Sequence, residues 1–390
     1  MKKLFLMFSV ACIVLSCSMP TLSPEYRADE AAYLYVLGGV AVAPDAPNID
    51  QTLDDPDDGI HLRSILIADI DRGNIEISNW RRAKSTLPAT HFENDEILHW
   101  SYLNHNTHIY KGRLYAGPAS YNGDTQAVPA DFVVWADIDP VTGELSEFSH
   151  SERLPDPPGS QRIGASAIVE INNRAYYYVL GGNTNEGQTA VISYAEIDKT
   201  TGAPGKWQIT RTQLPSRDWF NGALTYQGGV LHSSGHGRTG QMAVDMVSPD
   251  KDGDITESWK TSSYSSDYSR RWDHIMLKAK IMGREYIYLI GGAAEGLFVT
   301  DRVDFGGIRH DGFGEWSQAN PIPHARRRFS GASMGNLLIL TGGTFEDSAY
   351  GTNEIILGTV APDGTVNWKL SSQPMFQART FHGTAIYIKP

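Results

Sequence analysis

One short pattern recurs along this chain, an apolar run that ends in one or two glycines. The copies occupy residues 33–39, 113–117, 177–182, 230–235, 286–292 and 337–343. A run that is apolar on both faces is typical of a strand buried between two layers, and glycines after it are typical of close backbone approach or positive φ. One such unit cannot bury both of its faces. The six copies therefore predict a repeat architecture in which each unit packs against its neighbours.

The same features follow each glycine-ended run. An alternating segment comes next, then a polar turn such as residues 139–143, and then one large aromatic residue. The alternating segments are residues 65–70, 132–138, 190–197, 242–247, 299–305 and 354–360. The aromatics, spaced about 50 to 70 residues apart, are Trp80, Phe148, Trp207, Trp259, Trp316 and Trp368. We expect these aromatics to belong to the core of the repeats.

This pattern resembles the kelch repeat, in which each repeat forms one blade of a β-propeller. The resemblance covers residues 33–388 and implies an all-β fold, a six-bladed kelch-type β-propeller that occupies residues 31–390 as one domain. Residues 379–388 are a strand of the type that precedes a glycine-ended strand, whereas the run at 33–39 has no such strand before it. We therefore expect the C-terminal strand to pair with the first N-terminal strand, which closes the ring without an open sheet edge.

Residues 1–16 have the features of an export signal. Lys2 and Lys3 precede an apolar stretch that has signal-peptide length and is too short to span a membrane. The stretch ends at Cys17 in a segment that resembles a bacterial lipobox, with Leu15 where the family usually has a small residue. Only Cys17 remains once the signal is removed, so lipidation explains it better than a disulfide. The alternative is an ordinary secretory signal, after which Cys17 is neither lipidated nor part of a disulfide.

Residues 17–30 contain Pro20 and Pro24 and are expected to be a tether between the lipid and the propeller. In enteric bacteria, an aspartate directly after the lipidated cysteine retains a lipoprotein at the inner membrane. This chain has Ser18 at that position, so we expect the outer membrane. We expect a monomeric protein of the bacterial cell envelope that contacts the membrane through its lipid alone. A secreted or periplasmic protein is the alternative location.

No metal and no cofactor is expected. Aspartates cluster in the loop at residues 40–62 and again at 250–254. Carboxylates of this kind can bind Ca²⁺, but a solvated acidic loop is the simpler interpretation. Histidines gather in the second repeat without a recognised metal-ligand spacing, at His91, His99, His105 and His108.

One basic residue stands just before the first strand of each repeat. These residues are His99, Arg162, Arg217, Arg271, Arg327 and Arg379. The kelch resemblance implies that the first strand lines the central channel and that arginines near its start point into a pocket. In a chain of formal net charge −12, such a pocket would attract a small anion, and arginine suits carboxylate or phosphate. The alternative is a structural role, in which repeat arginines donate to carbonyls between blades.

Two classes of function remain open. The first is a binding module for an acidic small molecule, a glycan or a protein partner at the predicted arginine-lined pocket. The second is a carbohydrate-active enzyme, because some kelch-like propellers are sialic-acid mutarotases and other propellers are polysaccharide lyases. Acid–base chemistry would then fall to His99, Tyr102 or His274. The acidic charge balance argues against a nucleic-acid partner.

Overall fold

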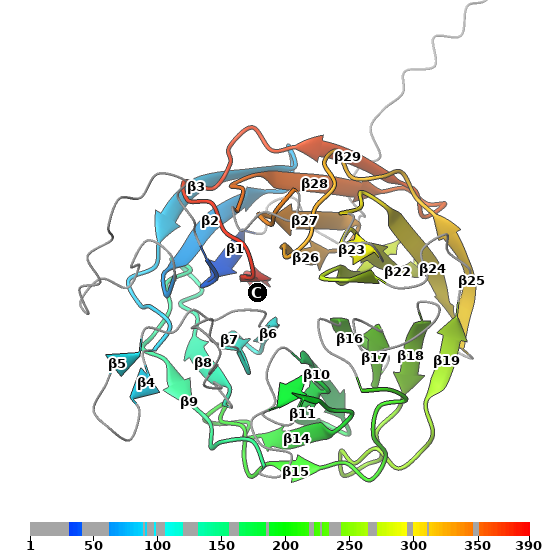
Figure 1. The fold of residues 1–390 in the computed structure, drawn as a ribbon. Helices are drawn as coiled ribbons and strands as arrows, with labels where there is room; N and C mark the ends of the chain where they lie inside the picture. The colour runs from blue at the N-terminus through cyan, green and yellow to red at the C-terminus, as the bar shows by residue number, and fades with distance from the viewer. Residues whose placement is uncertain are drawn as a thin grey trace, which may run out of the picture.

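The computed structural model describes most of the chain after residue 30. The described residues are 31–40, 62–88, 90–91, 97–98, 106–119, 132–155, 164–184, 187–217, 222–226, 228–233, 243–263, 271–294, 299–309, 312–345 and 351–390. Within these ranges the regular structure is all strand, and six four-stranded antiparallel sheets stand around one axis (Figure 1). The chain is therefore a six-bladed β-propeller, as predicted.

Each blade runs outward from an innermost strand at the axis. Blade one is β30 (Gly383–Ile388), β1 (Ala32–Leu37), β2 (Ile65–Asp71) and β3 (Glu76–Arg82). Blade two is β6 (Thr107–Tyr110), β7 (Arg113–Ala116), β8 (Val134–Asp137) and β9 (Ser149–His150). Blade three is β10 (Ala165–Ile171), β11 (Arg174–Leu180), β14 (Ile192–Ile197) and β15 (Gln208–Ile209).

The second half of the ring repeats this order. Blade four is β16 (Gly222–Tyr226), β17 (Gly229–Ser233), β18 (Ala243–Val247) and β19 (Lys260–Ser263). Blade five is β21 (Ile275–Ile281), β22 (Arg284–Ile290), β24 (Val303–Arg309) and β25 (Gly312–Gln318). Blade six is β26 (Ser330–Met334), β27 (Leu337–Thr341), β28 (Ile355–Val360) and β29 (Val366–Leu370).

The ring closes where the two ends of the chain meet. Strand β30 pairs antiparallel with β1, from Ala32 opposite Ile388 to Leu37 opposite Gly383. Figure 1 shows the red C-terminal strand beside the blue first strand. Blade one is therefore built from both ends of the described chain, which confirms the predicted closure.

The glycine-ended runs are the second strands of the blades, and their burial explains their sequence. Every residue of β1 is buried, and so is every residue of β11 after Arg174. Neighbouring blades pack against both faces of such a strand, so both faces must be apolar. The repeated aromatics lie farther out. Trp207 is buried, whereas Trp316 and Trp368 are half-buried and pair across the ladder with Gly306 and Gly358.

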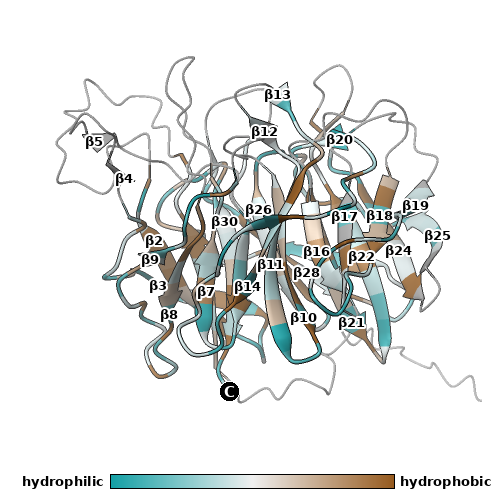
Figure 2. Ribbon diagram, turned by 90° about the horizontal axis from the view of Figure 1, so that it is seen from below, coloured by the Kyte–Doolittle hydropathy of each residue, from teal (hydrophilic) through white to brown (hydrophobic). Residues whose placement is uncertain are grey.

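The two faces of the ring carry different connections. Second strands end and third strands begin on one face, here called the loop face, which also carries the short ribbons β12–β13 (Asn183–Thr184 and Gly187–Gln188) and β20–β23 (Arg271–Trp272 and Ala293–Ala294) (Figure 2). The opposite face, here called the turn face, carries the tight turns and the C-terminus. Among the described residues, no helix is long and apolar enough to cross a membrane.

Candidate functional site

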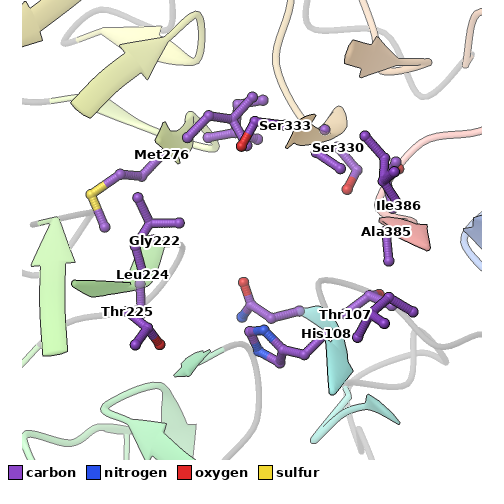
Figure 3. Close-up of a pocket in the computed structure, with 18 of the residues that line it drawn as sticks. Thr107, His108, Gly222, Leu224, Thr225, Met276, Ser330, Ser333, Ala385 and Ile386 are labelled. Carbon is purple, nitrogen blue, oxygen red and sulfur yellow. The ribbon is translucent and has the colours of Figure 1, made fainter. Parts of the chain in front are cut away.

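The innermost strands enclose a cavity of about 400 Å³ on the propeller axis. Strands β6, β16, β21, β26 and β30 supply most of its wall, and β10 contributes Ile168. Figure 3 shows the side chains arranged in a ring around an open centre, with Met276, Ser333 and Ile386 among them. The cavity therefore depends on residues that are far apart in the sequence and meet only in the closed ring.

The wall of this cavity is neutral. Its polar side chains are Asn106, Thr107, His108, Tyr110, Thr225, His274, Ser330, Ser333 and Thr384, and its other residues are apolar or glycine. Each innermost strand is also the last strand of its sheet, so one edge of its backbone is not covered by another strand and can offer N–H and C=O groups to the axis. The described cavity can thus form many hydrogen bonds without a charged wall.

His108 is held in the cavity wall by a network that joins blades two and three. Its Nε2 lies 2.8 Å from Ser166 Oγ, which in turn lies 3.1 Å from the Tyr177 hydroxyl. That hydroxyl donates to the carbonyl of Gly117 at 2.6 Å. Burial lowers the pKa of His108 to about 4, so its imidazole is neutral at pH 7. The sequence placed His108 only within a group of histidines and did not single it out.

His274 begins the wall on blade five, directly before β21. The side chain is buried and lines the cavity. Burial, together with the nearby Arg271 and His232, lowers its pKa to about 3. His274 is therefore neutral at physiological pH, and the structure places this sequence-predicted residue at the cavity.

The described arginines of the predicted ring do not face the cavity. Arg379 is fully buried and donates to the carbonyls of Gly38 at 2.7 Å and Ser64 at 2.9 Å. Arg271 is also buried and donates to the Leu289 carbonyl at 3.2 Å and to Asp304 at 3.0 Å. Each guanidinium thus joins the end of the second strand to the start of the third strand.

These contacts correct two parts of the sequence analysis. The described axial cavity is not lined by arginine, because a buried guanidinium must donate its N–H groups and the strand ends supply acceptors. The contacts also lie within one blade rather than between blades, since Arg379 bonds to Gly38 and Ser64 of the same blade-one strand junction.

The predicted ring is one residue out of register in blade six. Arg326, not Arg327, makes the equivalent contacts, donating to the Gly342 carbonyl at 2.9 Å and to Glu354 at 2.7 Å. A Cβ added to Gly343 would meet the Arg327 carbonyl, as one added to Gly292 would meet that of Trp272. Arg327 is therefore the counterpart of Trp272. Three consecutive arginines conceal this register in the sequence.

The remaining predicted residues divide into two groups. Arg217 is exposed, and it is not part of the axial wall. Four others lie outside the described residues, namely Cys17, His99, Tyr102 and Arg162. In the described ranges, no group of three His, Cys, Asp or Glu side chains is arranged to hold a metal ion.

A row of three residues borders the loop-face end of the cavity wall. Asp273, Arg328 and Phe381 occupy the second position after the buried arginines Arg271, Arg326 and Arg379, and all three have positive φ, at 54°, 56° and 56°. The Arg328 N–H donates to the Asp273 carbonyl at 3.3 Å, and the Phe381 N–H donates to the Arg328 carbonyl at 2.8 Å. None of these three is one of the predicted site residues.

Comparisons with known proteins bear on the fold. No protein-family model matches the chain, and no curated protein matches it. A solved structure of YjhT is similar, with a TM-score of 0.52 and 14% sequence identity, covering 72% of this chain and 86% of that chain. At this identity the similarity shows the fold alone. It agrees with the six-bladed propeller that the described residues form.

Proposed function

We propose that this chain is an exported, lipid-anchored propeller that binds a small hydrophilic molecule in its axial cavity. The observation that carries the proposal is the cavity itself, about 400 Å³ of neutral hydrogen-bonding and apolar wall. This volume falls in the range of about 300 to 1,000 Å³ that small-molecule sites occupy. An acidic small molecule, a glycan or the end of a peptide fits the proposal, and nucleic acid does not.

We assign the recognition of an acidic ligand to Arg328 and not to the predicted ring of arginines. The buried arginines use their N–H groups within the blades, as Arg379 and Arg271 do. Arg328, at the loop-face border of the wall, has a side chain that is 26% exposed. A guanidinium at this place favours a ligand with a carboxylate, because arginine binds carboxylates with strong charge-assisted hydrogen bonds.

Export and anchoring rest on the N-terminal sequence, outside the described residues. The signal-like residues 1–16 and Cys17 favour a lipid anchor, and the outer membrane is the proposed location. Binding in the cavity does not depend on the anchor, so the two parts of the proposal are tested separately.

A carbohydrate-active enzyme is the second candidate, and His108 is the observation that favours it. A neutral imidazole in a cavity wall, held through Nε2 by Ser166, can accept a proton from a bound sugar, and its pKa of about 4 makes it a weak base at pH 7. A mutarotase-like reaction needs this kind of proton transfer. A lyase would also need a group that neutralises the charge of a uronate, for which Arg328 is the described candidate.

The test of the binding proposal is to obstruct the cavity. Ser333→Phe puts a large ring into the wall, whereas Gln213→Phe adds the same ring at an exposed position. Calorimetry with a panel of acidic and neutral sugars should detect binding to the wild type and to Gln213→Phe, but not to Ser333→Phe. Equal binding by all three proteins would contradict a cavity site. Monitoring the bound sugars by NMR for a change of anomer or an unsaturated product distinguishes the enzyme from the binder.

A further inference from the structure

The border residues Asp273, Arg328 and Phe381 share an unusual backbone conformation. Residues other than glycine rarely adopt positive φ, and doing so costs free energy. Here three different residue types adopt it at equivalent places in blades five, six and one, with φ of 54°, 56° and 56°. The three blades therefore share a backbone arrangement that requires this conformation.

That feature is a continuous backbone arc. Arg328 donates to the carbonyl of Asp273 and receives the N–H of Phe381 on its own carbonyl, at 3.3 and 2.8 Å. The Thr380 hydroxyl adds a further bond of 3.1 Å to the Arg328 carbonyl. Because the arc is made of backbone groups, it does not require a carboxylate, a guanidinium or a phenyl ring at these positions.

The side chains of the arc nevertheless form one group. The Arg328 Nε lies 3.4 Å from Asp273 Oδ2, and the Arg328 guanidinium carbon lies 4.6 Å from the centre of the Phe381 ring. The ring thus supports the guanidinium by a cation–π contact. Each of the three residues is followed within three positions by a residue of the cavity wall, namely His274, Ser330 and Thr384.

Asp273 gives the second, independent observation. The residue is 8% exposed, and its Oδ1 is buried without a hydrogen-bond partner among the described residues. A buried carboxylate oxygen that is not hydrogen-bonded is unfavourable. Such a cost is typical of a binding site, where the missing donor belongs to the ligand.

We propose that Asp273 and Arg328 recognise a ligand that carries a carboxylate together with a hydroxyl or ammonium group. Arg328 binds the carboxylate, and Asp273 Oδ1 accepts a hydrogen from the neighbouring donor. The ligand class is thus a compact hydroxy- or amino-carboxylate, including acidic sugars. This inference rests on the proposed function, because the pair stands at the border of the axial cavity.

Three probes of similar size separate the two contacts. D-glucuronate has a carboxylate and hydroxyls, D-glucose lacks the carboxylate, and cyclohexanecarboxylate lacks the hydroxyls. Calorimetry should show that the wild type binds glucuronate about tenfold or more tightly than either of the other two. Arg328→Gln should weaken glucuronate binding by about thirtyfold and abolish the preference over glucose. Asp273→Asn should abolish the preference over cyclohexanecarboxylate.

Arg82→Gln is the matched control, and the Tm of Asp273→Asn is the second measurement. Arg82 also lies over a phenylalanine ring, that of Phe376 at 5.8 Å, but on the outermost strand of blade one, so Arg82→Gln should bind like the wild type. Asp273→Asn should keep or raise Tm while it weakens binding, because burial raises the pKa of Asp273 despite the nearby Arg328, so the charged carboxylate is unfavourable in its place. A merely structural ion pair would instead lower Tm and leave binding unchanged.

The outcomes distinguish this inference from the proposed function. Wild-type binding without a preference for glucuronate, or normal glucuronate binding by Arg328→Gln, overturns the inference while Ser333→Phe still tests the cavity. Binding of glucuronate that Ser333→Phe leaves intact overturns the proposed cavity site. If the wild type binds none of the three probes, the inference is overturned, and the wider sugar panel with Ser333→Phe remains the test of the proposed cavity site.

Discussion

The hydroxyl of Tyr288 in blade five donates a hydrogen bond of 2.8 Å to the carbonyl of Gly364 in blade six, 76 residues away. The same link joins three other pairs of neighbouring blades in the described residues. It connects Tyr35 to Gly143, Tyr115 to Gly202 and Tyr178 to Gly253, at 2.7, 2.9 and 2.6 Å. Each tyrosine lies in a second strand and each glycine in the turn between the third and fourth strands of the next blade. Buried tyrosines therefore join the blades on the turn face.

Removing one of these hydroxyls should destabilise the ring. Tyr288→Phe leaves the Gly364 carbonyl without its donor in a buried place, which costs about 1–3 kcal/mol. Denaturation by urea should show a lower midpoint. Tyr286→Phe is the control, because the Tyr286 hydroxyl bonds to Pro362 at 2.9 Å in a partly solvated place and water can replace it. Equal stability of Tyr288→Phe and the wild type would show that the link is unimportant.

The turn glycines should not tolerate a side chain. Gly364 has φ of 90°, and a Cβ there would meet the ring of Phe305. Gly112 has φ of 74°, but nothing lies within 4 Å of an added Cβ. Gly112→Ala should therefore cost only the backbone strain, about 1–2 kcal/mol, and Gly364→Ala clearly more. Thermal unfolding of the two variants measures the difference, and similar losses would mean that the Phe305 ring moves aside freely.

Loss of the closing strand should open the ring. Deletion of residues 379–390 removes β30, which pairs with β1 from Ala32 to Leu37, and also removes Arg379. The edge of β1 would then be free to pair with other molecules. Size-exclusion chromatography should show aggregation, and Tm should fall well below that of the full chain. Deletion of Pro390 alone is the control, and a soluble truncation with unchanged Tm would place the closure elsewhere.

Acid should weaken the fold through the buried histidines. Burial lowers the pKa of His274 to about 3 and that of His108 to about 4, below the value of about 6.5 expected in an unfolded chain. Their contribution to stability is complete above about pH 6.5 and is lost as the pH falls from there towards 3 or 4. The Tm of His274→Gln should fall less than that of the wild type between pH 7 and pH 4.5. His150 is exposed, so the Tm of His150→Gln should change with pH as that of the wild type does. If the change of Tm with pH is the same in His274→Gln as in the wild type, the buried His274 does not cause the acid sensitivity.

The proposed lipid anchor is tested by fractionation. Cys17→Ala removes the proposed acceptor of the lipid. The wild type should be found with the membranes, and the variant should appear in the soluble fraction. The same distribution for both proteins would exclude anchoring through Cys17 and favour an ordinary secretory signal.

The sequence by itself determined the repeat, the number of blades and the closure of the ring. These features have local causes that a sequence displays directly. A second strand packed on both faces must be apolar throughout, as β1 is, and the turn to the third strand needs glycines with positive φ, as at Gly342 and Gly343. Residues 379–388 could be matched with the first blade because each repeat requires an innermost strand.

Only the tertiary structure decided the site. The direction of a long arginine side chain depends on acceptors elsewhere in the chain, and Arg379 reaches Gly38, 341 residues away in sequence. The cavity wall joins β6, β16, β21, β26 and β30, and His108 is held in it by Ser166 across the blade boundary. Asp273 and Arg328 come together because the ring brings successive strand starts side by side, 3.4 Å apart at their charged groups. Repeats predict which residues are equivalent, whereas contacts between repeats decide what each of them binds.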